Sequence, residues 1–371
     1  MVDLNDRAEQ LPGSLRRAAE DGSFVPFERF MEIALYAPEE GFYTRRSAAI
    51  GSAADFYTAP HVSPLFGQAV ANRVVREFES LGRPYRFTII EMGPGEGALA
   101  EPLVRSLGPR LPADTEVRYL ISERSGPLRQ RALERIGRAA PASWEVTAVD
   151  SAGAMGPFVG VVVANEYLDA LPGQRFVLRD HAWHELGVRW TDGRFRWAGS
   201  EAPAPRRSLP WPAGAEEGTI LELSRYQEAF LRELADHLLA GVALFLDYGM
   251  EEEELVRGHP RGTLAAYRDH HLSDDPLQGP GTADLSMYVN FTRLRHAARA
   301  AGLTEVGPPR SQSQALGEWG IAELIRGELD RAPSEEARVK AHLAAKNLLF
   351  GFDRFRVWEL SPPERTATVA T

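Results

Sequence analysis

Cysteine is absent from the 371 residues of the chain, which excludes disulfide bonds, thiol catalysis and thiolate metal sites. Long apolar runs are absent as well: the stretches 159–164 and 242–246 are strand-sized, far below the ~20 residues that cross a membrane. Positive charge is in the minority, with a formal net charge of −10, whereas binding to nucleic-acid phosphates needs clustered Lys and Arg. We therefore expect neither a nucleic-acid partner nor a membrane partner.

The remaining composition is that of a globular protein. Hydrophobic residues make up 44% and charged residues 25% of the chain, which is ordinary for such proteins, and the length allows a large core with accessory pieces. Residues 1–7 are too acidic for a transit peptide and lack the apolar core of a secretory signal. The expected location is therefore the cytoplasm.

Short apolar strands alternate with helices through the middle of the chain. The expected strands cover 87–91, 117–122, 159–164 and 242–247, and helices are expected at 98–107 and 127–136. This alternation predicts an α/β fold with a doubly wound, mostly parallel sheet covered on both faces. A polar–apolar alternation over 174–199, with Thr191-Asp192-Gly193 at its centre, predicts an inserted β-hairpin.

Four parts follow from this pattern. Residues 1–81 form a helical N-terminal region, with helices expected at 11–20, 27–36 and 61–81. Residues 82–250 form the core, with a β insertion at 174–218. Residues 251–290 are irregular and form a lobe. Residues 291–371 complete the core with helices near 291–301, 315–328 and 334–347 and a last strand at 355–360.

A glycine turn follows the first expected strand, in the string Glu91-Met92-Gly93-Pro94-Gly95-Glu96-Gly97. Glycines let the backbone approach a ligand closely. With Ala98 in the third slot the string also fits the dinucleotide pattern G-x-G-x-x-G/A, so an oxidoreductase is the alternative. Glu91 and Glu96 would repel a pyrophosphate but favour the ammonium and sulfonium of S-adenosylmethionine. The turn therefore favours a methyltransferase that uses S-adenosylmethionine.

Polar residues end the later strands, where ligands bind in open α/β sheets. Glu123 is the candidate for the ribose hydroxyls, and Asp150 is the candidate for the adenine, unless it is only a loop acid. Asn165 and Glu166 end the strand at 159–164, and Asp169 follows three residues later. Asn165 is expected beside the cofactor. Glu166 and Asp169 are expected to orient a methyl acceptor such as a guanidinium, or alternatively to cap a following helix.

Histidines gather in the lobe but give only a weak metal signal. His259, His270 and His271 lie there with Asp274 and Asp275, and two adjacent histidines in a loop are more typical of solvated surface than of a metal site. We therefore predict no metal cofactor.

Several short motifs are distributed from about residue 24 to residue 360. They include Leu35-Tyr36-Ala37-Pro38, Gly41-Phe42-Tyr43, Asp55-Phe56-Tyr57-Thr58-Ala59-Pro60, the glycine turn, Ala164-Asn165-Glu166, Asp169-Ala170-Leu171-Pro172, Asp247-Tyr248-Gly249, Gly262-Thr263-Leu264 and Asp284-Leu285. In this combination the chain resembles the MidA-like S-adenosylmethionine-dependent methyltransferases.

The resemblance implies a class I, Rossmann-like methyltransferase fold with S-adenosylmethionine as cofactor. A mitochondrial member of the family is a complex I assembly factor that methylates an arginine on a partner protein, so a protein arginine is the expected acceptor. A small-molecule acceptor and a non-catalytic cofactor-binding scaffold are the alternatives. The resemblance also implies that 55–60 folds over the cofactor, which adds Asp55 to the catalytic candidates and Thr58 to the cofactor-binding ones. It places the lobe at 251–290 on the acceptor side, and a homodimer is a further expected state.

The chain departs from the family pattern in two segments, and the second of them concerns the acceptor. The family usually has a glycine pair where this chain has Ala53-Ala54, and it usually reads Asp-Leu-Thr-x-His-Val-Asp-Phe where this chain reads 284–291 as Asp-Leu-Ser-Met-Tyr-Val-Asn-Phe. Tyr288 and Asn290 therefore replace a histidine and an aspartate. The departures leave the expected cofactor binding intact and leave the acceptor open.

Overall fold

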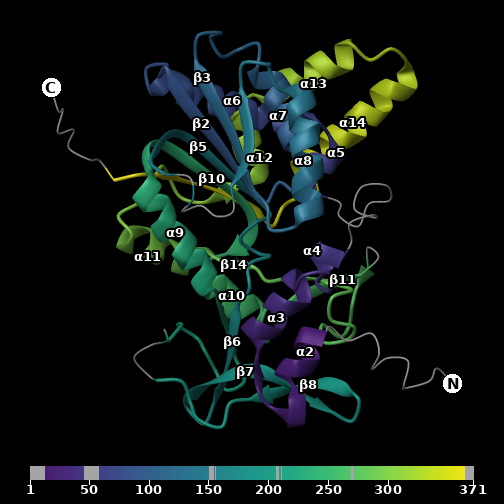
Figure 1. The fold of residues 1–371 in the computed structure, drawn as a ribbon, viewed down its shortest axis with the longest axis vertical. Helices are drawn as coiled ribbons and strands as arrows, with labels where there is room; N and C mark the ends of the chain where they lie inside the picture. Colours follow the sequence, from purple (N-terminus) through teal and green to yellow (C-terminus); the bar gives the residue numbers. More distant parts are fainter. Residues whose placement is uncertain are drawn as a thin grey trace. The chain divides into compact units, whose positions relative to one another are not determined.

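The structure is a computed structural model that describes residues 13–45, 58–149, 156–205, 211–268 and 271–363, with the single residues 154 and 209 (Figure 1). The chain divides into two compact units. We call the unit formed by 56–167, 230–248 and 295–371 the core unit, and the unit formed by 1–55, 168–229 and 249–294 the composite unit. Among the described residues, none of the helices combines the length and apolarity needed to cross a membrane.

A mostly parallel sheet forms the centre of the core unit. Its strands run in the order β15-β17-β10-β5-β2-β3-β4, and β4, β3, β2, β5 and β10 are parallel to their neighbours, whereas β17 is antiparallel to β10. The bounds are β2 Arg86–Met92, β3 Glu116–Ser122, β4 Glu145–Val149, β5 Phe158–Asn165, β10 Leu238–Met250, β15 Thr304–Glu305 and β17 Phe355–Ser361. The expected α/β fold with a mostly parallel sheet is confirmed.

Both faces of this sheet are buried, as its continuous apolar strands require. Val161 and Val163 of β5 pack into a cluster with side chains of the helices on one face. Val162 points to the opposite face and is equally buried, and on β10 Phe245 contacts Phe230 with ring centroids 6.0 Å apart. The helices are α5 Ala59–Val62, α6 Leu65–Ser80, α7 Ala100–Leu107, α8 Gly126–Ala139, α9 Arg225–His237, α11 Phe291–Ala300, α12 Gln312–Glu318, α13 Ile321–Asp330 and α14 Glu335–Phe350.

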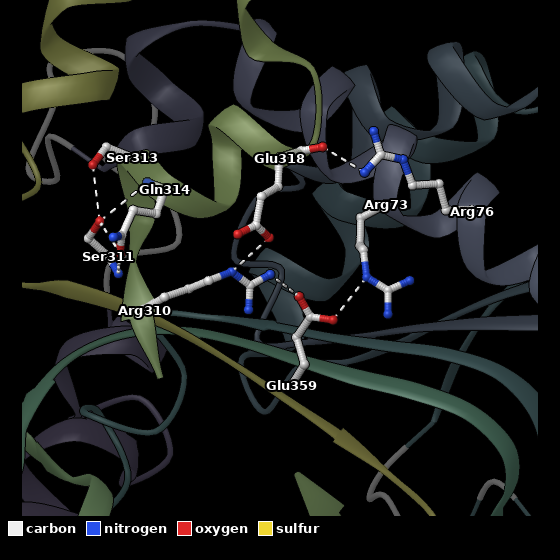
Figure 2. A network of polar contacts seen from close by, with 8 residues as sticks. All are labelled: Arg73, Arg76, Arg310, Ser311, Ser313, Gln314, Glu318 and Glu359. Carbon is white, nitrogen blue, oxygen red and sulfur yellow. Dashed lines mark hydrogen bonds and ion pairs between the residues drawn. The ribbon is translucent and has the colours of Figure 1, made fainter. Parts of the chain in front are cut away.

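The last strand of the core unit is held by an ion-pair network around the buried Glu359 (Figure 2). The Glu359 carboxylate on β17 is 3% exposed and accepts a hydrogen bond from Arg73 Nε of α6 at 2.9 Å and another from Arg310 of β16 (Arg310–Ser311). Arg310 also lies 3.0 Å from Glu318 of α12. Because an unpaired buried charge is costly, these contacts fix the C-terminal strand against a helix from the beginning of the core unit.

The composite unit is built from antiparallel strands and short helices. One of its sheets has the order β1-β7-β6-β9 with β8 paired to β7, and the other has the order β12-β11-β13. The strands are β1 Val25–Pro26, β6 Gln174–Arg179, β7 Ala182–Thr191, β8 Arg194–Gly199, β9 Ile220–Leu223, β11 Ala265–Arg268, β12 His271–Leu272, β13 Asp284–Ser286 and β14 Val289–Asn290. The helices are α2 Gly13–Ala18, η1 Glu20–Gly22, α3 Phe27–Tyr36, α4 Phe42–Arg45 and α10 Glu252–Gly258.

The inserted hairpin is present at the expected place. Strands β7 and β8 pair from Leu186↔Gly199 to Thr191↔Arg194, and the connecting residues Asp192 and Gly193 both have positive φ, 51° and 73°. Two successive residues with positive φ are the geometry of the two-residue hairpin turn that fits twisted strands.

Several expected elements differ in the structure. The helix expected over 315–328 is divided into α12 and α13, because Gly320 has φ +81° and stops the helical path. The helix expected over 61–81 is likewise divided, at Ser63-Pro64. The expected irregular lobe at 251–290 contains α10 and three strand pairings, and α9 and β9 were not predicted. The expected ranges 1–81 and 82–250 each contribute to both units.

Candidate active site

The glycine turn after β2 uses its three glycines for different reasons. Gly93, Gly95 and Gly97 all have positive φ, 61°, 56° and 82°, which side chains disfavour. A Cβ at Gly93 would lie 3.0 Å from the Tyr167 ring, and a Cβ at Gly97 would lie 3.3 Å from Ala132 Cα, whereas a Cβ at Gly95 would meet no atom within 4 Å. Packing therefore requires the first and third glycines, and only at Gly95 does the turn face open space that a ligand can enter.

Glu123, directly after β3, reaches this turn. One carboxylate oxygen accepts a hydrogen bond from the Gly95 N–H at 3.1 Å, and the other accepts one from the Ser125 N–H at 2.8 Å. Burial raises the pKa of Glu123 to about 7. The side chain predicted to hold the ribose hydroxyls thus lies against the open position of the turn, and it also supports the turn itself.

Glu91 lies inside β2 and is 2% exposed. Its carboxylate accepts a hydrogen bond from the Tyr119 hydroxyl at 2.6 Å. Burial raises the pKa of Glu91 to about 7 despite this hydrogen bond, and the nearby charge of Glu123 contributes to the rise. A carboxylate in such surroundings gains stability from any cation that comes close.

Glu96 attracts a cationic ligand less strongly than its sequence position implies. Its carboxylate lies 3.6 Å from Arg135 of α8 and 3.8 Å from the Nε2 of His61, so part of its charge is directed at the Arg135 guanidinium. The other ring nitrogen of His61 shares a hydrogen bond with the Thr58 hydroxyl at 2.7 Å. His61 thereby links Thr58, a predicted cofactor-binding residue, to the glycine turn. Burial lowers the pKa of His61.

The end of β5 makes a strained turn. Glu166 has φ +50°, an uncommon conformation for a residue with a side chain that is typical of functional sites. The turn is held by the Glu166 N–H, which donates to the Leu246 carbonyl at 2.9 Å, and by the Tyr167 N–H, which donates to the fully buried Asp247 carboxylate at 3.1 Å. Strand β6 is the next regular element after β5. The alternative that Glu166 and Asp169 cap a helix is therefore wrong.

Asn165 precedes this turn and has one unsatisfied atom. Its side-chain nitrogen donates to Glu166 Oε1 at 3.3 Å. Its side-chain oxygen is buried and has no hydrogen-bond partner among the described residues. Buried acceptors are rarely left without a donor, so this oxygen suits a ligand that donates a hydrogen bond.

Asp169 belongs to the composite unit, where the fold brings it close to two residues far away in the chain. Its backbone carbonyl accepts a hydrogen bond from the Met287 N–H at 3.1 Å. The Tyr43 hydroxyl donates to Asp284 Oδ1 at 2.7 Å. Burial and the charges of Asp284 and Asp169 raise the pKa of Tyr43 well above its ordinary value, so this phenol stays a proton donor. The Tyr36 ring stacks on the Tyr43 ring, with the ring centroids 5.5 Å apart.

A pocket of the composite unit opens beside Asp169. Its lining includes Glu222, Ser224, Met287 and Tyr288 as well as Asp169. Tyr288, one of the two replaced residues of the lobe, therefore lines the same pocket as Asp169.

Asn290, the other replaced residue of the lobe, has a structural role that an aspartate shares. Its side-chain oxygen accepts a hydrogen bond from the Arg293 N–H at 3.1 Å at the start of α11, and Asn and Asp are equally good helix caps. Its side-chain nitrogen donates to Glu252 at 3.3 Å, which an aspartate cannot do. The replacement at position 290 thus fits the local contacts.

Two predicted site residues, Asp55 and Asp150, lie outside the described residues. Conversely, sequence reasoning did not select Tyr43, Asp247 or Asp284 as site residues, although each lies in one of the family-like motifs. Within the described ranges no group of three or more His, Asp or Glu side chains is arranged to hold a metal ion.

Comparison with known proteins identifies the family of this chain. The model of a family described as "Putative S-adenosyl-L-methionine-dependent methyltransferase" matches residues 69–309. The chain belongs to this family. The methyltransferase is 30% identical to the mitochondrial protein arginine methyltransferase NDUFAF7 homolog of Drosophila melanogaster, over 81% of this chain and 74% of that protein. It is 26% identical to human NDUFAF7 over 92% of this chain and 81% of that protein.

Solved structures agree with this membership. A crystal structure from Burkholderia thailandensis bound to S-adenosyl-homocysteine has 32% identity and a TM-score of 0.82, covering 97% of this chain and 94% of that chain. A native structure from the same organism has 31% identity and a TM-score of 0.81. The protein is thus an S-adenosylmethionine-dependent methyltransferase, and the oxidoreductase alternative is set aside. The mitochondrial names of the curated relatives give the expected cytoplasmic location no support.

The residues of the core unit fit S-adenosylmethionine. Gly95 leaves space over the backbone of the turn, and the Asn165 side-chain oxygen is a buried acceptor in need of a donor. Glu91 and Glu123 are acids whose charged forms a cation or hydroxyl groups would stabilise. A phosphate-bearing cofactor would instead meet two buried acids.

Proposed function

We propose that this methyltransferase transfers a methyl group to a nitrogen of an arginine side chain on a protein partner. The observation that carries the proposal is the pair of buried aspartates in the composite unit, Asp169 at 8% and Asp284 at 6% exposed, arranged around the Tyr43 hydroxyl. Carboxylates are the natural partners of a planar guanidinium, which donates up to five hydrogen bonds. The curated relatives, named protein arginine methyltransferases, support the same acceptor.

On the cofactor side we assign Glu91 to the ammonium group, Glu123 to the ribose hydroxyls, and Gly93, Pro94, Gly95, Gly97, Thr58 and Asn165 to the surrounding contacts. S-adenosylmethionine supplies a methyl group already activated by the sulfonium. The protein's own contribution is to hold the acceptor in line and exclude water, and such positioning can contribute up to ~7–11 kcal/mol.

The acceptor must also lose a proton, because a guanidinium remains charged at neutral pH. Asp169 orients the guanidinium through charge-assisted hydrogen bonds, and Glu166 or Asp169 receives the proton, directly or through a water molecule. The hydrogen bond from Tyr43 keeps the Asp284 carboxylate oriented. Because the pKa of Tyr43 is raised well above its ordinary value, the phenol stays protonated and does not compete as a base.

The test is transfer of an isotopically labelled methyl group from the cofactor to a cell lysate, with wild-type protein and the Asp169→Asn variant in parallel. We expect labelled protein that yields methylarginine on acid hydrolysis, and we expect the variant to give little label. Label on a different amino acid, or only in the small-molecule fraction, would contradict the proposal. The second result would support the small-molecule acceptor, which the replacement of a family histidine by Tyr288 in the pocket beside Asp169 keeps open.

A further inference from the structure

Helix α14 exposes large apolar side chains on a surface that the catalytic function does not use. Only Ala345 and Leu348 of its 16 residues are buried. Val339, Leu343 and Phe350 are 50%, 55% and 74% exposed. Helices of this length owe most of their stability to packing of an apolar face, and exposed apolar patches commonly mark interaction sites. Figure 1 shows α14 and α13 as a helical hairpin in the core unit.

The exposed residues form one stripe along the helix. Val339, Leu343 and Phe350 are separated by four and seven residues, so they share one face. Two charged residues extend the same stripe: the exposed Glu336 lies three residues before Val339, and the exposed Lys346 lies three residues after Leu343. The stripe thus carries an acid toward its N-terminal end and a base toward its C-terminal end.

We propose that this α14 stripe binds the α14 stripe of a second copy of the chain, with the two helices antiparallel about a twofold axis that crosses the stripe at the level of Ala341, whose own side chain lies on the opposite face of the helix. A twofold axis makes such an interface self-complementary. With the axis at Ala341, Val339 of one copy faces Leu343 of the other, and Glu336 of one copy faces Lys346 of the other. A single register therefore satisfies both the apolar and the charged pairs, each of them twice.

The charge order favours a second copy in this orientation over other arrangements. A parallel pair would place Glu336 against Glu336 and Lys346 against Lys346, which repel each other. In the antiparallel register Phe350 faces Ala332, a small residue in the turn between α13 and α14. Because one helix pair is smaller than a standard interface of about 1,600 Å², the dimer should be weak and should depend on protein concentration.

The experiment is sedimentation equilibrium of the full chain over roughly a hundredfold concentration range, since association is governed by mass action. Leu343→Asp should abolish dimerisation. Glu336→Lys and Lys346→Glu should each raise the dissociation constant about tenfold, because each places two pairs of like charges in contact. The double variant, Glu336→Lys with Lys346→Glu, should restore dimerisation. Arg338→Glu, an exposed change on the same helix but off the stripe, should leave it unaltered.

All these positions are exposed, so the variants should fold, and their melting temperatures check this. A wild-type protein that stays monomeric throughout the range would overturn the proposal. A dimer that is unaffected by Leu343→Asp would overturn it too, since another surface would then hold the copies together. Single charge variants that weaken the dimer without rescue by the double variant would refute the antiparallel register.

Discussion

The core unit and the composite unit assemble their polar groups over very different distances along the chain. In the core unit, Glu91 lies on β2, the glycine turn follows β2, and Glu123 follows the adjacent parallel strand β3, so the contact from Gly95 to Glu123 joins residues only 28 positions apart. In the composite unit, the contact from Tyr43 to Asp284 joins residues 241 positions apart. The polar cluster of the core unit thus comes from segments close together in the chain, whereas the polar cluster of the composite unit exists only once three distant segments have come together.

The two units also hold their acids differently. Glu91 accepts a hydrogen bond from the Tyr119 hydroxyl and Glu123 accepts two from backbone N–H groups, so neither carboxylate forms a hydrogen bond with a cationic side chain that the structure describes, and burial raises the pKa of each to about 7. The side chain of Glu222 in the composite unit is 9% exposed and accepts hydrogen bonds from Arg175 at 2.9 Å and from the Thr263 hydroxyl at 2.6 Å. An acid with few partners has most to gain from a cationic ligand, so the core unit is prepared for its ligand and the acid at Glu222 is already satisfied.

The largest expected effect is on the turnover rate, and it comes from a substitution in the composite unit. Asp169→Asn should lower the single-turnover rate by about 10²–10⁴-fold, because it removes a group that acts on the acceptor. Cofactor affinity, measured by calorimetry, should stay within about twofold, since the interaction is absent from the cofactor complex. Parallel loss of affinity and rate would show that Asp169 serves the cofactor, and an unchanged rate would remove it from the catalytic residues.

Glu123→Ala should differ from Asp169→Asn in that it lowers the affinity for the cofactor. We expect S-adenosylmethionine to bind about 1.5–3 kcal/mol more weakly, as for a lost hydrogen bond to a charged group. Because Glu123 also accepts from the Gly95 and Ser125 N–H groups, Glu123→Gln is the matched control that retains one acceptor oxygen. Full affinity in a folded Glu123→Ala variant would contradict the ribose assignment.

A pH titration should sharpen the contrast further. Burial raises the pKa of Glu91 from 4.5 to about 7, so between these values the folded protein keeps a proton that the unfolded chain has released. The stability of the unliganded protein should therefore fall as the pH rises through this window. Binding of the ammonium requires the carboxylate, so cofactor affinity should rise up to about tenfold from pH 6 to pH 8.

Glu91→Gln is the variant that checks this titration. It should flatten the part of both pH profiles that Glu91 contributes, leaving the part due to Glu123, whose pKa is also about 7. Denaturant unfolding and calorimetry at several pH values measure the two profiles. Identical profiles for wild type and Glu91→Gln would show that Glu91 is not the titrating group.

The smallest expected effect distinguishes glycines within the turn. Gly95→Ala should cost about 1–2 kcal/mol of stability, the penalty of a side chain in left-handed backbone, because its Cβ meets open space. Gly97→Ala should cost more, because its Cβ would also press on Ala132 Cα at 3.3 Å. Thermal denaturation of both variants gives the order, and an equal loss would argue against the packing role of Gly97.

The predicted and observed bounds of particular helices and strands show which elements the sequence predicts well. Residues 27–36 form the expected helix, and Glu116–Ser122 and Phe158–Asn165 match the expected strands closely, because their hydrophobic spacing is a local property. The expected helix at 315–328 was too long, since glycine inside a periodic pattern does not reveal whether its φ is positive. Helix α9 was missed, although its buried residues Phe230, Leu231 and Leu234 follow helical spacing.

The sequence by itself determined the parallel sheet, the glycine turn with its neighbouring acids, and the choice of S-adenosylmethionine over a dinucleotide. These depend on residues adjacent in the chain or on consecutive strands, where spacing dictates position. Only the tertiary structure decided that Tyr43 donates to Asp284 close to Asp169, that Asp247 supports the strained turn at Glu166, and that the next regular element after β5 is the strand β6. Such contacts arise when segments far apart in the chain pack together, and the local spacing of residues does not predict that packing.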